Sequence, residues 1–344
     1  MRIAIHDKDS TWSARWIEYC REHQISYGIV DCYSTDIITQ LQSYDVLLWQ
    51  FDHFLLRDIL FARHILLAAQ RMGLAVFPDL NTSWHYDDKI AQTYLLQAID
   101  APLAKTWIFY NAEEAHTWLQ KDASYPLVAK LRRGSGSHNV QLVRNEREAL
   151  RYCLRMFGKG IHPSPSYLSD SRHKLRTAGG LHGIIRRLKK APRFFKEAYV
   201  GKRTFHHERG YVYFQQFLAN NTHDTRVTVV GRRAFAFRRS VRQGDFRASG
   251  SGIIDYDPSQ IDLRSIQIAL DVSQTLAAQS LAFDFAFDGS NQPRIIEISY
   301  TFLSTATLKC PGYWSEDLSF VPGHNHIEDL ILRNLLHPNF GDPQ

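Results

Sequence analysis

Short apolar runs alternate with helix-like segments through residues 1–85, and this alternation constrains the fold more than any other feature of the sequence. The runs typical of buried strands are residues 2–6, 27–30, 46–49 and 75–77. Between the first two, Trp12, Trp16 and Tyr19 recur at helical spacing. Strands separated by helices imply βαβ units and a parallel sheet, so we predict a Rossmann-like domain over residues 1–85. It lacks a GxGxxG pattern and therefore does not indicate a dinucleotide site.

The remainder of the sequence predicts a mixture of helices and antiparallel strands. Helices are expected at Asp87–Ile99, Ala112–Leu119, Glu146–Phe157 and Leu263–Gln279. Strands are expected at Thr106–Tyr110, Leu127–Lys130, Asn139–Val143, Tyr211–Leu218, Thr225–Val230, Arg233–Arg239, Phe283–Phe287 and Arg294–Ile298. The last two are joined by a turn at Asp288–Asn291. We expect an α/β (α+β) chain in three parts, at residues 1–85, 86–211 and 212–335, with an insertion at about 158–210.

The insertion holds an unusual density of positive charge. Between Arg172 and Arg209 there are 12 Lys or Arg and two acids, in a chain whose net charge is +6. Such a field attracts phosphates, nucleic acids or anionic membranes. Apolar residues from Ile184 to Phe195 are flanked by Arg and Lys, a pattern that also suits an anionic membrane surface. We therefore expect contact with an acidic polymer or an anionic membrane here.

The sequence carries no signal for secretion or for membrane insertion. The first ten residues lack the apolar core of a signal peptide, and the most apolar window, 59–77, is interrupted by charged residues. The four cysteines form no CxxC pair, which argues against a zinc site and against a disulfide framework. We expect a cytoplasmic protein, with the inner membrane face as a second location if the basic segment binds lipid.

Three groups of residues are suited to phosphate or metal chemistry, although each also has a simpler explanation. Lys130 ends a strand before Gly134-Ser135-Gly136-Ser137, where backbone N–H groups and an ammonium can surround a phosphate. An ordinary hairpin with a surface lysine would look the same. Asp284 and Glu297 lie near the facing ends of two strands and suit a divalent cation, or a salt bridge. Arginines such as Arg226 suit phosphoryl or carboxylate groups, or solvated strand faces.

The order of these pieces narrows the interpretation. Along the chain they run Lys89, Lys130, the glycine turn, Gln215 to Leu218, Asp224-x-Arg226, GDFRASGSG at 244–252, Asp284, and Glu297 to Ser299. Over about residues 80–300, apart from the insertion, this order resembles the ATP-grasp superfamily, most closely its RimK-like and glutathione-synthetase-like carboxylate–amine ligases. The resemblance implies the ATP-grasp fold, in which a Rossmann-like N-terminal domain precedes two α+β subdomains that grip ATP.

The resemblance also implies roles for individual residues. The residues that would bind ATP fall into three groups. Lys89 and Lys130 would contact the phosphates, and Gly134, Ser135 and Gly136 would belong to a flap that closes over them. The hinge that binds adenine would be formed by Gln215, Gln216, Phe217 and Leu218. The residues that would face the transferred phosphoryl group and the substrate carboxylate are Arg226, Arg239 and Arg247. The ligands of Mg²⁺ or Mn²⁺ would be Asp284, Glu297 and Ser299. This chain has Ser299 where the family usually has Asn, and Phe246-Arg247-Ala248-Ser249 where the family pattern is FRxN.

The implied reaction is ATP-dependent amide formation through an acyl phosphate, between a small-molecule or glycan carboxylate and an amine. We hypothesise that the chain adds an amino acid to a surface polysaccharide precursor or a peptide. Two alternatives stay open: an ATP-grasp kinase that phosphorylates a hydroxyl, and a non-enzymatic protein that binds nucleic acid or membrane through the basic segment. Nucleic acid is the less favoured partner, because that segment has no recognition motif and no evident stacking platform.

Overall fold

The computed structural model describes residues 1–337 except 9, 53–55, 135–138, 164–205 and 242–252. The chain divides into two compact units. The large unit comprises Met1–Tyr86, Ala91–Ala104 and Leu218–Gln344, and the small unit comprises Asp87–Ile90 and Lys105–Phe217. Most of the predicted basic insertion, including the apolar residues from Ile184 to Phe195, lies outside the described residues. The predicted division into three parts stays a prediction.

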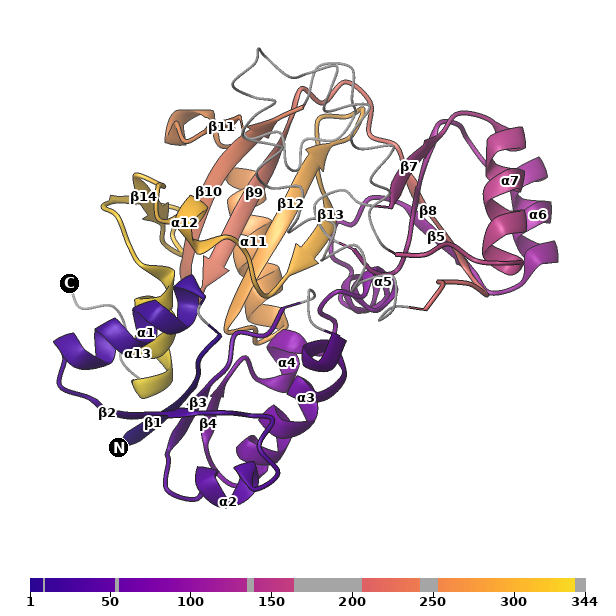
Figure 1. Ribbon diagram of the computed structural model, residues 1–344. Helices are drawn as coiled ribbons and strands as arrows, with labels where there is room; N and C mark the ends of the chain where they lie inside the picture. Colours follow the sequence, from indigo (N-terminus) through magenta and orange to yellow (C-terminus); the bar gives the residue numbers. More distant parts are fainter. Residues whose placement is uncertain (9, 53–55, 135–138, 164–205, 242–252, 338–344) are drawn as a thin grey trace, which may run out of the picture. The chain divides into compact units, whose positions relative to one another are not determined.

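The large unit begins with the predicted parallel sheet (Figure 1). Its strands β1 (Arg2–His6), β2 (Ser26–Val30), β3 (Val46–Leu48) and β4 (Ala75–Phe77) pair in the order β2-β1-β3-β4, and every pairing is parallel. The connecting helices are α1 (Thr11–Glu22), α2 (Ile37–Leu41), α3 (Leu56–Arg71) and, after β4, α4 (Leu80–Ser83). The Rossmann-like alternation is therefore confirmed, with strand ends within one residue of their predicted positions.

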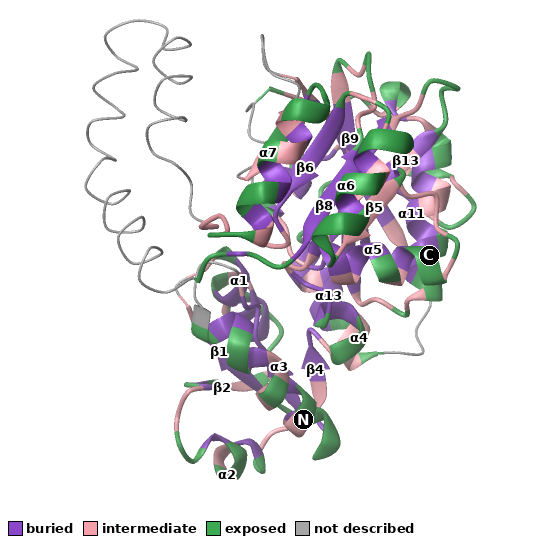
Figure 2. Cartoon of the chain, turned by 90° about the vertical axis from the view of Figure 1, so that its right-hand side faces the viewer, coloured by how far each residue is buried: buried purple, intermediate pink, exposed green. Residues whose placement is uncertain are grey.

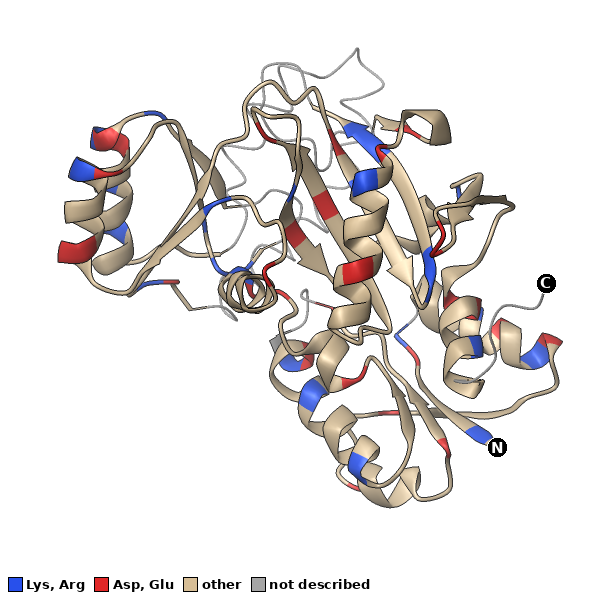
Figure 3. Ribbon diagram, turned by 180° about the vertical axis from the view of Figure 1, so that it is seen from behind, with Lys and Arg blue, Asp and Glu red and all other residues tan. Residues whose placement is uncertain are grey.

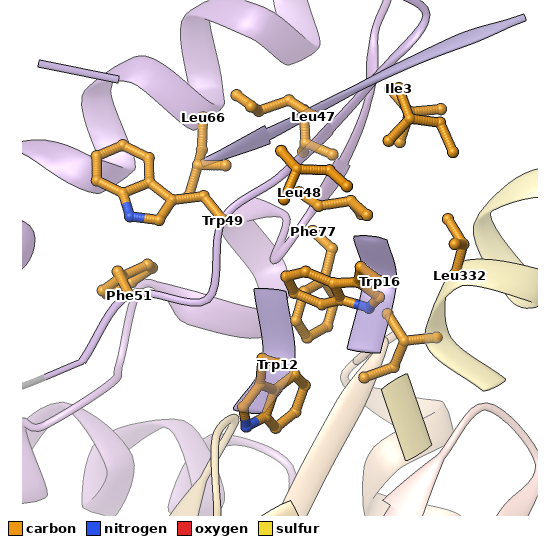
Figure 4. Close-up of a cluster of buried hydrophobic side chains, with 14 of the residues drawn as sticks. Ile3, Trp12, Trp16, Leu47, Leu48, Trp49, Phe51, Leu66, Phe77 and Leu332 are labelled. Carbon is orange, nitrogen blue, oxygen red and sulfur yellow. The ribbon is translucent and has the colours of Figure 1, made fainter. Parts of the chain in front are cut away.

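The periodic aromatic residues of α1 explain why this helix packs on the sheet. Ser10 caps the helix by accepting a hydrogen bond from the Ser13 amide, as a capping residue should. Trp12 and Trp16 are buried and lie beside Phe77 of β4 in the core shown in Figure 4. Leu332 of the C-terminal helix α13 (Ile327–Leu336) joins the same cluster. The first and last parts of the chain thus share one core within the large unit.

A second, seven-stranded sheet completes the large unit. Its strands are β9 (His223–Val230), β10 (Arg233–Ser240), β11 (Ile254–Asp255), β12 (Ser280–Phe287), β13 (Pro293–Ser299), β14 (Gly312–Trp314) and β15 (Phe320–Pro322). They pair in the order β13-β12-β9-β10-β14-β15, with β11 on β10, and all pairings are antiparallel. Helix α11 (Leu263–Thr275) packs on one face, and η1 (Pro258–Gln260) and α12 (Ser304–Thr307) are short connections.

The small unit is an antiparallel sheet backed by two helices. Strands β5 (Thr106–Phe109), β6 (Leu127–Lys130), β7 (Val140–Val143) and β8 (Val212–Gln216) pair in the order β5-β8-β6-β7. Helices α6 (Ala112–Lys121) and α7 (Glu146–Phe157) have exposed outer faces and buried inner faces (Figure 2). Helix α5 (Lys89–Ala98) begins in the small unit and continues in the large unit, where Leu96 joins the core.

His85, in the short segment between α4 and α5, has a buried imidazole ring, while its backbone carbonyl accepts a hydrogen bond from Gln92. It is fully buried, and neither ring nitrogen finds a partner among the described residues. Burial, with a smaller contribution from the Arg63 charge, lowers the pKa of His85 to about 4. Unfolding would restore an ordinary pKa of about 6.5, so the unfolded chain takes up a proton between these two values. The contribution of the neutral His85 ring to the free energy of unfolding is therefore fully present above pH 6.5 and is lost as the pH falls toward 4.

We expect the wild-type chain to lose about 2 kcal/mol more unfolding free energy between pH 7 and pH 5 than His85→Gln does. Glutamine keeps a polar side chain but does not titrate. Urea denaturation at the two pH values measures the difference. Equal losses for the two proteins would show that His85 is protonated in the folded state or is hydrated there.

Candidate functional site

One face of the seven-stranded sheet carries charged side chains, whereas the other face packs against α11. Residues directly opposite each other on antiparallel strands point to the same face. Asp284 of β12 lies opposite both Glu297 of β13 and Arg226 of β9, and Arg239 of β10 lies opposite Asp224. Figure 3 shows charged positions on these long strands. The structure therefore brings five candidate or neighbouring residues from four strands to one face.

Four of these side chains form a network of ion pairs, which we call the arginine–aspartate quartet (Asp224, Arg226, Arg239 and Asp284). The Nε and Nη2 atoms of Arg226 donate to the two carboxylate oxygens of Asp284 at 2.7 and 2.8 Å. Arg239 donates in the same way to Asp224, at 2.7 and 2.6 Å. Its Nη2 atom also lies 2.8 Å from Oδ1 of Asp284. The salt bridge that the sequence left open for Asp284 is thus present, with two partners.

The charges of the quartet shift the pKa values of its members in different directions. Burial raises the pKa of Asp284, but the charges and hydrogen bonds of Arg226 and Arg239 more than offset this, so the pKa lies below its ordinary value. Burial and the neighbouring Asp284 charge raise the pKa of Asp224, against the opposing effect of Arg239. Burial alone would lower the pKa of Arg239, but the charges and hydrogen bonds of Asp284 and Asp224 more than offset this and raise the pKa above its ordinary value. Two guanidinium groups and two carboxylates leave this buried set close to neutral.

Asp284, Glu297 and Ser299 fit a hard divalent cation by the chemistry of their oxygens. Glu297 and Ser299 are two residues apart on β13 and therefore share the face of Asp284. Ser299 donates its hydroxyl proton to the Thr301 carbonyl at 2.6 Å, so its remaining lone pairs can only accept. Carboxylate and hydroxyl oxygens are ligands that Mg²⁺ uses. Within the part of the chain that the structure describes, no cluster of three or more His, Cys, Asp or Glu could hold a metal. The set here has only two carboxylates and a serine.

The small unit holds the two predicted phosphate-binding lysines, and both are buried. Lys130, the last residue of β6, donates to the side-chain oxygen of Gln215 at 2.6 Å. Lys89, the first residue of α5, donates to the Gly134 carbonyl at 2.6 Å. Gly134 has φ = 118°, a conformation that favours glycine, at the start of the predicted flap. The structure thus places Lys89 against the first residue of this turn.

The predicted adenine hinge coincides with the boundary between the two units. Gln215 and Gln216 end β8, Phe217 is the last residue of the small unit, and Leu218 continues the chain in the large unit. The Gln216 amide donates to the Lys105 carbonyl at 2.8 Å. The side chain of Gln215 is buried and bonded to Lys130. Adenine binding by this segment stays a prediction.

Several predicted site residues lie outside the described residues. These are Ser135 and Gly136 of the predicted flap, and Arg247 with the rest of the segment 244–252. In the other direction, the sequence did not single out Asp224 as a site residue, although its i, i+2 spacing from Arg226 on a strand places both on one face. Likewise, no signal in the sequence indicated that Gln215 would contact Lys130, which is 85 positions away.

No protein-family model and no curated protein matches the sequence. Solved structures do match along almost the whole chain. The RimK-domain ATP-grasp protein of Sphaerobacter thermophilus is 14% identical with a TM-score of 0.55, over 98% of this chain and 100% of that one. The D-alanine–D-alanine ligase of Bacillus anthracis is 15% identical with a TM-score of 0.54, over 98% of both chains. The ATP-grasp ligase PsnB, solved with a minimal precursor, Mg and ADP, is 11% identical with a TM-score of 0.52, over 97% and 98%.

These likenesses define the class of fold. The chain has the ATP-grasp fold, as the sequence predicted, with its mixed α/β architecture spread over three sheets. Among the proteins that share this fold, it is similar to a RimK-domain protein, to a D-alanine–D-alanine ligase and to a ligase solved with a minimal precursor.

Proposed function

We propose that this chain is an ATP-dependent ligase that joins a carboxylate to an amine. The observation that carries the proposal is the row formed by Glu297, Asp284 and Arg226, which lie directly opposite one another on β13, β12 and β9 of an ATP-grasp fold. In this row two carboxylates, which bind cations, adjoin a guanidinium group, which binds anions. Similar folds include a ligase solved with Mg and ADP, which supports Mg²⁺ and ATP as the partners of these residues.

The residues divide the work by charge. A carboxylate that attacks the γ-phosphate of ATP brings two anions together, so the repulsion between them must be reduced. We assign Lys89 and Lys130 to the ATP phosphates, and Arg226 and Arg239 to the phosphoryl group and the substrate carboxylate. Asp284, Glu297 and Ser299 would hold Mg²⁺, which neutralises the phosphate charge when bound. The attack expels ADP and leaves an acyl phosphate, which the amine then attacks to form the amide with loss of phosphate.

This reaction requires no nucleophilic side chain, and the cysteines are consistent with that. All four are buried. Burial raises the pKa of Cys153 and of Cys310 to about 12 and that of Cys20 to about 11. A thiol needs a lowered pKa to act as a nucleophile at neutral pH. Covalent catalysis by cysteine is therefore disfavoured.

The acceptor proposed from the sequence is a surface polysaccharide precursor or a peptide, modified with an amino acid. The similarity to a D-alanine–D-alanine ligase and to a ligase bound to its precursor favours an amino acid or peptide among the substrates. The basic segment would contact an acidic polymer or an anionic membrane, a proposal that rests on its composition. Within the described ranges, no helix has the length and apolar character needed to cross a bilayer.

Lys130→Ala is expected to remove the stabilisation that Mg·ATP gives the wild-type protein. A ligand that binds only the folded state adds about 2.7 kcal/mol of stability at a hundred times its dissociation constant. Thermal unfolding with ATP, with and without Mg²⁺, measures this gain. Lys121→Ala is the matched control, because Lys121 is an exposed lysine at the end of α6 in the same unit. A wild-type protein that gains nothing from Mg·ATP would refute the proposal, as would a gain that Lys130→Ala retains.

A further inference from the structure

The two arginines of the quartet differ in the number of carboxylates that they contact. Arg239 makes a two-point contact with Asp224 and a single contact of 2.8 Å with Asp284. Arg226 has Asp284 as its carboxylate partner among the described residues. Among the described residues, Asp284 therefore contacts two guanidinium groups and Asp224 contacts one.

A divalent cation on Asp284 would disturb these contacts unequally. The cation carries the same sign of charge as both guanidinium groups, so its arrival weakens both of their contacts with Asp284. Arg239 keeps its two-point contact with Asp224, its direct partner in the pairing of β9 and β10. Arg226 loses its carboxylate partner, and its side chain is the more exposed of the two, at 21% against 10%.

We propose that Asp224 is a positioning residue: its two-point contact limits Arg239 to one contact with the metal ligand Asp284, so that Arg226 is the first of the two arginines to be released toward the anionic substrate. This inference rests on the proposed function, since it requires Mg²⁺ at Asp284. Asp224 is 6% exposed, so water cannot readily replace its carboxylate as the partner of Arg239. Without that carboxylate, Arg239 has Asp284 as its remaining anion and competes there with the metal.

The test measures metal affinity rather than turnover. Mn²⁺ is titrated into each protein in the presence of ADP, and free Mn²⁺ is followed by electron paramagnetic resonance. Asp224→Asn is expected to raise the Mn²⁺ dissociation constant about tenfold, the size of one charged contact. The double variant Asp224→Asn/Arg239→Gln is expected to return it to within about threefold of wild type, because the competing guanidinium is gone. Asp255→Asn, which removes the partner of Arg238 at the neighbouring position of β10, is the matched control and should change nothing.

If Asp224→Asn weakened Mn²⁺ binding merely by removing negative charge near the metal, the double variant would bind Mn²⁺ as weakly as Asp224→Asn does. That result would overturn the inference. An unchanged affinity in Asp224→Asn would overturn it as well. Arg226→Gln gives an independent reading if Asp224→Asn fails to fold. It removes the other competitor and is expected to tighten Mn²⁺ binding at least about threefold, whereas weaker binding would contradict the release of Arg226. Wild-type protein that binds no Mn²⁺ with ADP would instead refute the proposed function.

Discussion

Arg239→Met is expected to lower the free energy of unfolding by about 3–5 kcal/mol at pH 7, the cost typical of removing one member of a buried ion pair. The variant leaves Asp224 and Asp284 close together, with Arg226 as the remaining guanidinium of the quartet. Both carboxylates are buried and would repel each other, so the loss should exceed that for an exposed pair. Arg232→Met, which removes the exposed partner of Glu316, is the control and should cost no more than about 1 kcal/mol.

The same variant should respond to pH in the opposite sense from wild type. In wild type the pKa of Asp284 lies below its unfolded value, so its contribution is present above the unfolded pKa and is lost as the pH falls through the folded one. In Arg239→Met burial without the second arginine would raise the carboxylate pKa values, and acid would then relieve the repulsion. The stability difference between the two proteins should shrink from pH 7 to pH 4, as measured by urea denaturation. A difference that is constant with pH would show that lost packing, not charge, causes the destabilisation.

Glu297→Gln is expected to slow the formation of ADP by about three orders of magnitude in the presence of Mg²⁺, ATP, the carboxylate and the amine. The substitution keeps the size of the side chain but removes the charge that would bind the metal, and metal stabilisation of transferred charge is worth several kcal/mol. Because Glu297 is only partly buried, the folded state should lose little stability.

Glu316→Gln, an exposed acid in the same unit, should retain the wild-type rate. The rate is followed by coupled detection of ADP, and urea denaturation checks that both variants are folded. A Glu297→Gln protein with a rate within tenfold of wild type would remove Glu297 from the metal site. The proposed row would then lose its second carboxylate.

Local sequence patterns predicted most of the secondary structure. The apolar run of β12 and the turn after it gave element boundaries within a few residues of those observed, and the periodic tryptophans indicated the helix α1. Helix α5 begins two residues later than predicted, because Asp87 has φ = 54° and lies outside the helix. These features depend on neighbours in the sequence, which is why they could be predicted.

The contacts within the site depend on strand order, which the sequence does not reveal. The hairpin of β12 and β13 placed Asp284 near Glu297, and the turn between them made that prediction possible. The pairing of β12 with β9 brings Arg226 to Asp284 from 58 positions away. No local pattern fixes such a register. The sequence therefore singled out Arg226, Arg239 and Asp284, but not the ion-pair network that they form with Asp224.

The most direct test of the ligase proposal is to trap its acyl phosphate with hydroxylamine. The protein is incubated with Mg²⁺, ATP, hydroxylamine and a panel of carboxylates, including amino acids, peptides and acidic glycans, and hydroxamate and ADP are measured together. We predict hydroxamate and ADP in equal amounts with at least one carboxylate, and neither product with Glu297→Gln. ADP accompanied by a stable phosphorylated hydroxyl compound, with no hydroxamate from any carboxylate, would contradict the account and identify the protein as a kinase.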